Sequence, residues 1–328
     1  MSAGDGVRMA DKDSFKARLK QAEILREEGR FDSALAVLDS IAADPENRVL
    51  GPLTVLGLPR QLHSAYLKVA KRTGDPVRRI GWQHTLVPPP AVLAPYGRFS
   101  TAERAELAEA GRQPVPRILH QVWIGPAELP VSAGAWAAHA TRHGYEYRLW
   151  READLSAAGM DEHPVFKAML AIGDLPGAVD VARYLILARF GGIYLDCDWY
   201  PARRDLAFQD RLPLVGLAAL AEKTPRDLGS GSVLLTNSLI AAPPGHPVFR
   251  RILDALPAAA AALPGAPAWW STGPLLFTVV CRGGAVTVAD AALVAGELPR
   301  RAPFADVEAL CETAEREDGG LLVAWKSW

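Results

Sequence analysis

The sequence is poor in the features that place a protein outside the cell or in a membrane. Its three cysteines are far apart, so they match neither a disulfide framework nor the CxxC spacing of a zinc site. A reducing compartment is therefore the simpler expectation. No apolar run approaches the roughly 20 residues that span a bilayer, and the polar N-terminus lacks the apolar core of a signal peptide. We expect a cytoplasmic protein without a membrane span.

The chain also lacks an excess of charge of either sign. It has 36 lysines and arginines against 37 aspartates and glutamates, a formal net charge of −1. No basic run resembles a nucleic-acid-binding patch, so nucleic acid is not an expected partner. Hydrophobic residues make up 49% of the 328 residues, which is typical of a globular protein with one large domain or two smaller ones.

The first part of the chain has helical periodicity. Apolar residues recur at helical spacing before and after a break at residues 27–29, which predicts a helical hairpin over residues 14–42. The turn resembles that of a tetratricopeptide unit, but a repeat array needs about three units and only one is visible. A third helix is predicted near residues 59–72. We assign residues 1–112 to a small all-α region that caps the next domain or binds a partner protein or peptide.

Residues 113–328 have a different pattern, in which strands alternate with helices. Strands are predicted at residues 117–125, 145–150 and 192–196, and a helix at residues 176–190. Alternation of this kind indicates an α/β domain built on one sheet.

Two aspartates, Asp196 and Asp198, follow the third predicted strand in the stretch GGIYLDCDWY. Side chains alternate along a strand, so we expect both carboxylates to point to one side and Cys197 to the other. Two carboxylates at this spacing can converge on one divalent cation, and oxygen ligands suit Mg²⁺ or Mn²⁺. Open α/β sheets bind ligands at the carboxyl ends of their strands, where the acid pair would lie. The alternative is a solvated acid pair at an exposed strand end.

Another reading of the acid pair is the first motif of haloacid-dehalogenase-type phosphatases, in which the first aspartate is a nucleophile. Trp199 and Tyr200 are too bulky for the turn that follows that motif, so we rank this reading lower. In the helix before the strand, Asp180 and Arg183 are three residues apart and therefore lie side by side.

Several motifs, in this order along the chain, resemble one family of enzymes. They are RILHQVWIG (117–125), Trp150, VDVARYLILARFGGIYLDCDWY (179–200), NSLIAAPPGHPVF (237–249), TGP (272–274) and SW (327–328). They are similar to the DXD-containing sugar transferases related to the yeast outer-chain α-mannosyltransferase and to capsular polysaccharide transferases, and more distantly to the large glucosylating toxins. The resemblance covers about residues 115–328.

The resemblance implies a GT-A fold, which is a mixed, Rossmann-like α/β sheet that binds a nucleotide-sugar and a divalent cation, usually Mn²⁺. It implies a retaining hexosyltransferase, with a UDP-sugar favoured over a GDP-sugar as donor. The acceptor is unknown and is a polysaccharide, a natural product or a protein. An inactive transferase fold that serves as a binding module is the alternative from another class.

The resemblance also implies roles for individual residues. The residues implied for the nucleotide and diphosphate are Trp123, which would stack on the nucleobase, Tyr194, Asp196, Gly273 and Trp328. The residues implied for the donor sugar and the reacting centre are Asp180, Arg183 and Asn237. The implied metal ligands are Asp196, Asp198 and Ser327.

The chain departs from the family at its C-terminal motif. In many relatives a histidine shortly before SW helps to hold the metal, and the stretch LLVAWKSW has no histidine. We therefore expect modest metal affinity.

Overall fold

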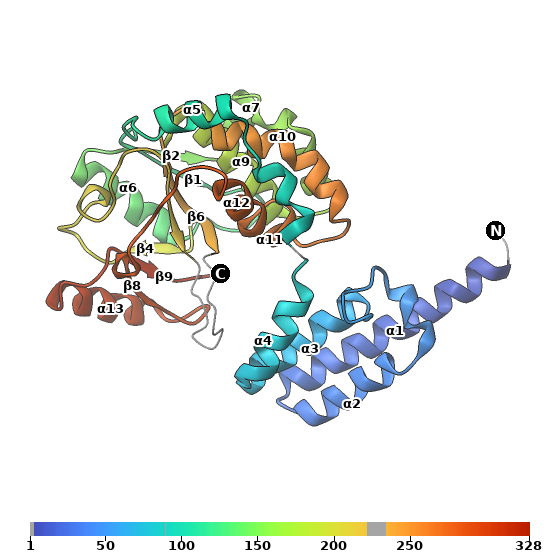
Figure 1. Cartoon of the computed structure of the whole chain (residues 1–328). Coiled ribbons are helices and arrows are strands. Elements are labelled where there is room, and N and C mark those ends of the chain that lie inside the picture. Colours follow the sequence, from blue (N-terminus) through green and yellow to red (C-terminus); the bar gives the residue numbers. More distant parts are fainter. Residues whose placement is uncertain (1–2, 89, 222–233) are drawn as a thin grey trace. The chain divides into compact units, whose positions relative to one another are not determined.

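The computed structural model describes residues 3–88, 90–221 and 234–328, and the chain divides into two compact units, Met1–Pro89 and Pro90–Trp328 (Figure 1). No helix in the described ranges combines the length and the apolarity needed to cross a bilayer.

The division falls before residue 112, where the sequence predicts the domain boundary. The reason is α5 (Thr101–Ala110), which packs on α10 (Pro247–Ala262) of the second unit. Arg251 forms an ion pair with Glu103, and Arg250 Nη2 lies 2.5 Å from a carboxylate oxygen of Glu106. These contacts attach residues 101–110 to the sheet unit.

The first unit is a small helical array. Its helices are α1 (Ala3–Glu27), α2 (Phe31–Ala42), α3 (Arg60–Thr73) and α4 (Pro76–Leu86). The predicted hairpin and third helix are present, and the unpredicted α4 begins at once because Asp75 caps it by accepting a hydrogen bond from the Arg78 amide. The helices share one apolar core, which includes Phe15, Ala22, Leu25, Ala34, Leu38, Ile41, Leu62 and Val69.

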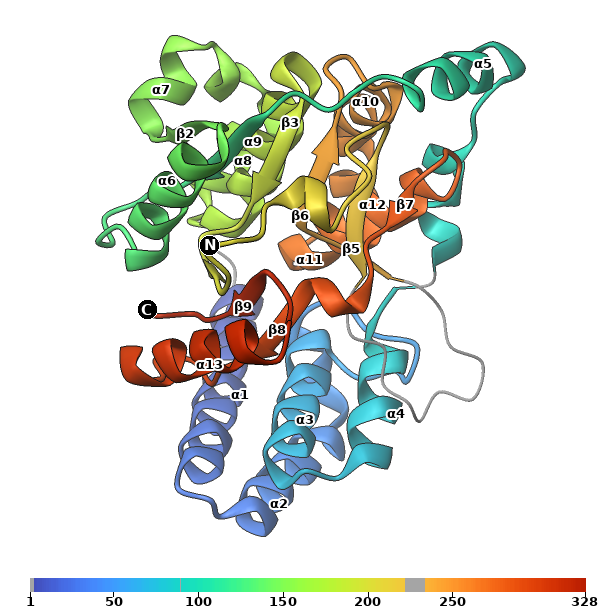
Figure 2. The same cartoon turned by 90° about the vertical axis from the view of Figure 1, so that its left-hand side faces the viewer.

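The second unit is built on a mixed six-stranded sheet in the order β2-β1-β3-β6-β5-β7 (Figure 2). Its strands are β1 (Ile118–Val122), β2 (Glu146–Trp150), β3 (Gly192–Leu195), β5 (Ala218–Ala221), β6 (Leu235–Ala242) and β7 (Thr287–Val288). β1 pairs in parallel with β2 and β3, whereas β6 is antiparallel to β3 and β5. The predicted mixed α/β fold class, with helices preceding it, is thus confirmed.

Helices cover both faces of this sheet. On one face, Leu119 and Ile193 share a core with Trp136 of α6 (Val131–His143). On the other, the ring of His120 contacts Phe190 of α9 (Leu175–Phe190), which packs beside α8 (Pro164–Ala171) and α10. The remaining helices of this unit include α7 (Glu152–Ala157), α11 (Ala268–Ser271) and α12 (Pro274–Cys281).

A second, smaller sheet follows the acid pair. It has the order β4-β9-β8, with β4 (Trp199–Pro201), β8 (Val294–Glu297) and β9 (Leu322–Ala324), and α13 (Phe304–Arg316) packs on it. β4 is antiparallel to β9, and Trp199 pairs with Ala324. β4, which follows the acid pair, therefore pairs with β9, which leads into the C-terminal motif.

Two glycines let α9 turn directly into β3. Gly191 and Gly192 have φ angles of 61° and 94°, which disfavour any residue with a side chain. A Cβ on Gly191 would lie 2.5 Å from the Pro244 nitrogen, and one on Gly192 would lie 2.6 Å from the Ile118 carbonyl oxygen. This junction fixes α9, which carries Asp180 and Arg183, against the strand that carries the acid pair.

Candidate active site

The acid pair lies at the edge of the main sheet where β1 and β3 end and where the antiparallel β6 begins. A cavity of about 460 Å³ opens there. Its charged and polar lining residues are Asp180, Arg183, Asp196, Asp198, Thr236, Asn237, Ser238, Glu297 and Lys326. Its tryptophans are Trp199, Trp269 and Trp325. The structure therefore brings five of the predicted site residues into one cavity.

Arg183 connects the two carboxylates that flank it. Its Nη2 lies 3.0 Å from Asp180 Oδ1 and 3.2 Å from Asp196 Oδ1, and its Nη1 donates to the Asn237 carbonyl. The guanidinium also lies 4.6 Å from the centre of the Tyr194 ring. Burial opposes the charge of Arg183, but the carboxylates of Asp196 and Asp180 raise its pKa, so it stays protonated.

Asp180 is a buried acceptor with three donors. Besides Arg183, Asn237 Nδ2 lies 2.7 Å from Oδ1, and Thr272 Oγ1 lies 2.8 Å from Oδ2. Burial raises the pKa of Asp180 to about 6, although Arg183 and Thr272 favour its charged form. The pair of Asp180 and Arg183 is thus not a solvated surface pair, since the two side chains are only 7% and 5% exposed.

The acid pair lies in a turn, which corrects the predicted strand geometry. β3 ends at Leu195, and the Asp196 amide donates to the Ser238 carbonyl at 2.8 Å. Strand alternation therefore does not orient the acid pair. Cys197 between them is buried, and its thiol contacts the Val122 carbonyl.

Asp198 is the acid whose charge is disfavoured. Burial, and then the neighbouring Asp196 carboxylate, raise its pKa to about 7, while Lys326 and Arg183 act in the opposite direction. Two close, half-buried carboxylates fit a hard divalent cation, which would relieve their repulsion. Within the described ranges, no group of three or more histidine, cysteine or acidic residues is placed to hold a metal. The metal-binding roles of Asp196, Asp198 and Ser327 stay predictions.

The predicted nucleotide-binding residues lie in three places. Tyr194 is fully buried and its hydroxyl donates to Asp196 Oδ1 at 2.8 Å, so it supports the acid pair from within the protein. Gly273 approaches Asp180 closely, because a Cβ there would lie 2.9 Å from Asp180 Oδ2. The rings of Trp123 and Trp328 meet edge to face at 4.7 Å. None of these four described residues lines the cavity, and neither does Ser327.

The C-terminal motif is nevertheless tied to the acid pair. The Trp325 amide donates to the Asp198 carbonyl at 2.7 Å, and Arg300 Nε donates to the Trp328 carbonyl at 2.7 Å. Ser327 lies in the chain between these two anchors, and its side chain is half-buried.

Sequence reasoning missed three residues of this site. Thr272 donates a hydrogen bond to Asp180. The Tyr184 hydroxyl lies 3.1 Å from Asn237 Nδ2 and so belongs to the same network. Lys326 lines the cavity. Thr272 lies in the TGP motif, Tyr184 in the VDVARY part of the longest motif, and Lys326 directly before SW, but the motifs alone do not tell that these side chains reach the site.

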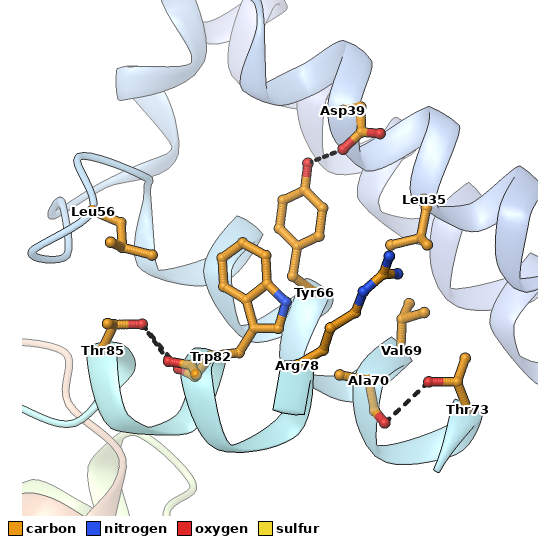
Figure 3. Close-up of a pocket in the computed structure, with 11 residues that line it drawn as sticks. Leu35, Asp39, Leu56, Tyr66, Val69, Ala70, Thr73, Arg78, Trp82 and Thr85 are labelled. Atoms are coloured by element: carbon orange, nitrogen blue, oxygen red, sulfur yellow. Dashed lines mark hydrogen bonds between the residues drawn. The ribbon is translucent and has the colours of Figure 1, made fainter. Parts of the chain in front are cut away.

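A larger cavity, of about 590 Å³, lies in the helical unit between α2, α3 and α4 (Figure 3). Tyr66 and Trp82 stack there with ring centres 4.7 Å apart, and the Tyr66 hydroxyl donates to Asp39 at 2.6 Å. This cavity has no paired carboxylates, so its chemistry does not compete with that of the sheet edge. Binding of a partner or an acceptor by the helical unit stays a prediction.

Comparison with known proteins connects the sheet-edge cavity to a family. Residues 136–211 match the family described as glycosyltransferase sugar-binding region containing DXD motif. The chain is also 30% identical to inositol phosphoceramide mannosyltransferase 3 of Schizosaccharomyces pombe over 173 residues. The aligned residues make up 51% of this chain and 44% of that protein. It is 27% identical over 177 residues to a mannosyl phosphorylinositol ceramide synthase of Saccharomyces cerevisiae, which is 52% of this chain and 44% of that protein.

The chain thus spans less than half the length of these two curated relatives. The solved structure of PaToxG Glycosyltransferase covers 58% of this chain and 76% of its own, with 14% identity and a TM-score of 0.42, too distant to establish a shared fold. The matched family region contains Asp180, Arg183 and the acid pair. The resemblance to DXD-containing glycosyltransferases that the sequence predicts is therefore confirmed over residues 136–211.

Proposed function

We propose that the chain is a glycosyltransferase that moves a hexose from a nucleotide-sugar to an acceptor, with Mn²⁺ or Mg²⁺ bound at the acid pair. The observation that carries this proposal is the cavity that the acid pair shares with Arg183, Asp180 and Asn237. The acid pair, Asp180 and Arg183 also lie inside the stretch that matches the family. Retention of the anomeric configuration is part of the proposal and rests on the family resemblance.

The proposed work of the chain's own residues is to hold the donor in one orientation. Asp180 accepts hydrogen bonds from Asn237 and Thr272 and has no freedom to rotate away. Arg183 keeps Asp180 and Asp196 at fixed positions on either side of its guanidinium. Such fixed polar groups lower the barrier by orienting the reacting atoms and by meeting charge where it develops.

The acid pair is the proposed metal site. Asp198, with Asp196 beside it, is the group whose charge most needs a counter-cation. A bound divalent cation supplies Lewis-acid stabilisation of the negative charge on the departing diphosphate.

Two donors are the direct alternatives. The sequence resemblance favours a UDP-sugar, and the names of the two yeast relatives add mannose, for which GDP-mannose is the donor to test. Those relatives are named for lipids that contain inositol phosphate and ceramide, so such a lipid joins polysaccharides, natural products and proteins among the acceptors to try.

A melting-temperature screen of UDP- and GDP-sugars in Mn²⁺, Mg²⁺ or EDTA tests the proposal. A ligand at a hundred times its dissociation constant stabilises a protein by about 2.7 kcal/mol, or about 5–10 °C for a unit of this size. We expect one nucleotide-sugar to give such a shift with a divalent cation and to be slowly hydrolysed, with the anomer of the released sugar retained. The proposal would be refuted if no UDP-sugar and no GDP-sugar raised the melting temperature or was hydrolysed.

A further inference from the structure

The positively charged side chains that line the cavity differ in how far neighbouring carboxylates neutralise them. Of the described residues that line it, Arg183 and Lys326 carry positive charge. Arg183 is 5% exposed and its guanidinium is engaged by Asp180, Asp196 and the Asn237 carbonyl. A donor diphosphate that enters the cavity therefore meets a guanidinium that is already neutralised on the protein side.

Lys326 differs from Arg183 in each of these respects. Its side chain is exposed, and it forms no ion pair within 4.0 Å of any carboxylate in the described ranges. Its Nζ lies 5.2 Å from the centre of the Trp328 ring. Its charge nevertheless acts on Asp198, so the ammonium and the acid pair belong to one electrostatic site.

The backbone holds Lys326 at this position. β9 ends one residue before Trp325, whose amide donates to the Asp198 carbonyl at 2.7 Å. On the other side, the Arg301 amide donates to the Lys326 carbonyl at 2.8 Å. The lysine therefore starts from a fixed backbone next to the acid pair, while its long side chain remains able to move.

We infer that Lys326 binds the diphosphate of the nucleotide-sugar donor through its Nζ. This inference rests on the proposed function and adds to it a residue that contacts the substrate. An ammonium group has three donors on a flexible four-carbon stem and binds phosphate oxygens as a point charge. The role of Lys326 is to offset the negative charge that the leaving diphosphate gains.

One consequence concerns the metal. Lys326 lines the cavity whether or not a cation is bound at the acid pair. With Lys326 as a second cation, part of the affinity for a nucleoside diphosphate survives chelation of the metal, and that part depends on Lys326.

Calorimetric titration of wild type and Lys326→Ala, in Mn²⁺ and separately in EDTA, tests the inference. The probes are UDP and uridine, and GDP and guanosine. We expect Lys326→Ala to weaken binding of the diphosphate about tenfold or more under both conditions, because a hydrogen bond to a charged group is lost. The affinity for the nucleoside stays within about twofold, because no phosphate is present to respond to the lost charge. Lys326→Arg restores most of the diphosphate affinity.

Lys167→Ala is the matched control, because Lys167 lies in the same unit and is paired at the surface with Glu162. It leaves diphosphate affinity unchanged, and melting temperatures confirm that each variant is folded. Equal diphosphate affinity of wild type and Lys326→Ala in both conditions overturns the inference and leaves the proposed function standing. If wild type binds neither UDP nor GDP, the proposed function fails and the inference fails with it.

Discussion

At the scale of single residues, the site depends on how a buried charge is compensated. Arg183 lies between Asp180 and Asp196, and Asn237 and Thr272 donate further hydrogen bonds to the Asp180 carboxylate. Burying one charge alone is costly, whereas a fully paired set is tolerated. The residues predicted to touch the donor sugar are therefore also the residues that hold the local fold together.

Replacement of Arg183 tests this coupling. Arg183→Met leaves Asp180 buried without its ionic partner, so we expect the free energy of unfolding to fall by about 3–5 kcal/mol. Urea denaturation measures the change. The same substitution at Lys167, which is 55% exposed, costs at most about 1 kcal/mol. Equal effects of the two substitutions would contradict the buried network.

The family resemblance predicted residues that the structure brings together. Asp180, Arg183, Asn237 and the acid pair were singled out from the order and spacing of their motifs, and all five line the cavity. Tyr194 donates to Asp196 and Gly273 lies close to Asp180, while the ligand contacts predicted for both stay predictions. A motif singles out a residue, and the packing around it shows which contacts the residue makes within the protein.

At the scale of elements, the junction between α9 and β3 positions the site. His120 of β1 supports this junction, because its Nδ1 accepts from Trp150 Nε1 at 3.1 Å and its Nε2 donates to the Gly191 carbonyl at 3.0 Å. A neutral imidazole satisfies both contacts. In a protonated imidazole, Nδ1 would also carry a hydrogen and would face the N–H donor of Trp150. Burial accordingly lowers the pKa of His120 to about 4.

The pH dependence of stability follows from this pKa. The unfolded chain protonates His120 near pH 6.5, while the folded chain resists protonation down to about pH 4. The stability from His120 is therefore complete above pH 6.5 and is lost as pH falls, by about 1.4 kcal/mol for each pH unit. We expect the difference in unfolding free energy between wild type and His120→Gln to shrink by this amount.

Denaturation curves from pH 7 to pH 4.5 measure the difference. The exposed His84 provides the control substitution, because His84→Gln removes a histidine without touching the buried contacts of His120. A difference for His120→Gln that does not change with pH would show that the contacts of His120 do not depend on its protonation state.

The sequence predicts some elements better than others for a physical reason. The strands and the helix around the acid pair are rich in apolar residues, and they form where expected. α4 was not predicted, because Gly74 and Pro76 suggest only a helix end, although Asp75 and Pro76 also begin a helix. The small sheet was not predicted either, since its short strands β4, β9 and β8 form by pairing between segments far apart in the sequence.

At the scale of the whole molecule, the site is assembled from segments far apart in the chain. The acid pair follows β3, Asn237 lies in β6, Thr272 precedes α12 and Lys326 follows β9. Pairing of β4 with β9 brings the last of these to the cavity. Such long-range pairing leaves no local trace in the sequence, so the contribution of Lys326 could not be predicted from its motif.

The central claim is that a divalent cation at the acid pair supports transfer from a nucleotide-sugar. Asp198→Asn keeps the size of the side chain and removes its charge. Since burial and Asp196 disfavour that charge, we expect the metal-free variant at pH 8 to be at least as stable as wild type.

The most direct test is the rate of Mn²⁺-dependent donor hydrolysis by wild type and by Asp198→Asn, with the melting temperature of each measured in EDTA. The account predicts that the variant loses at least about a hundredfold in rate while its melting temperature does not fall. A variant that retains the wild-type rate in Mn²⁺, or a wild type that is equally active in excess EDTA, would contradict it.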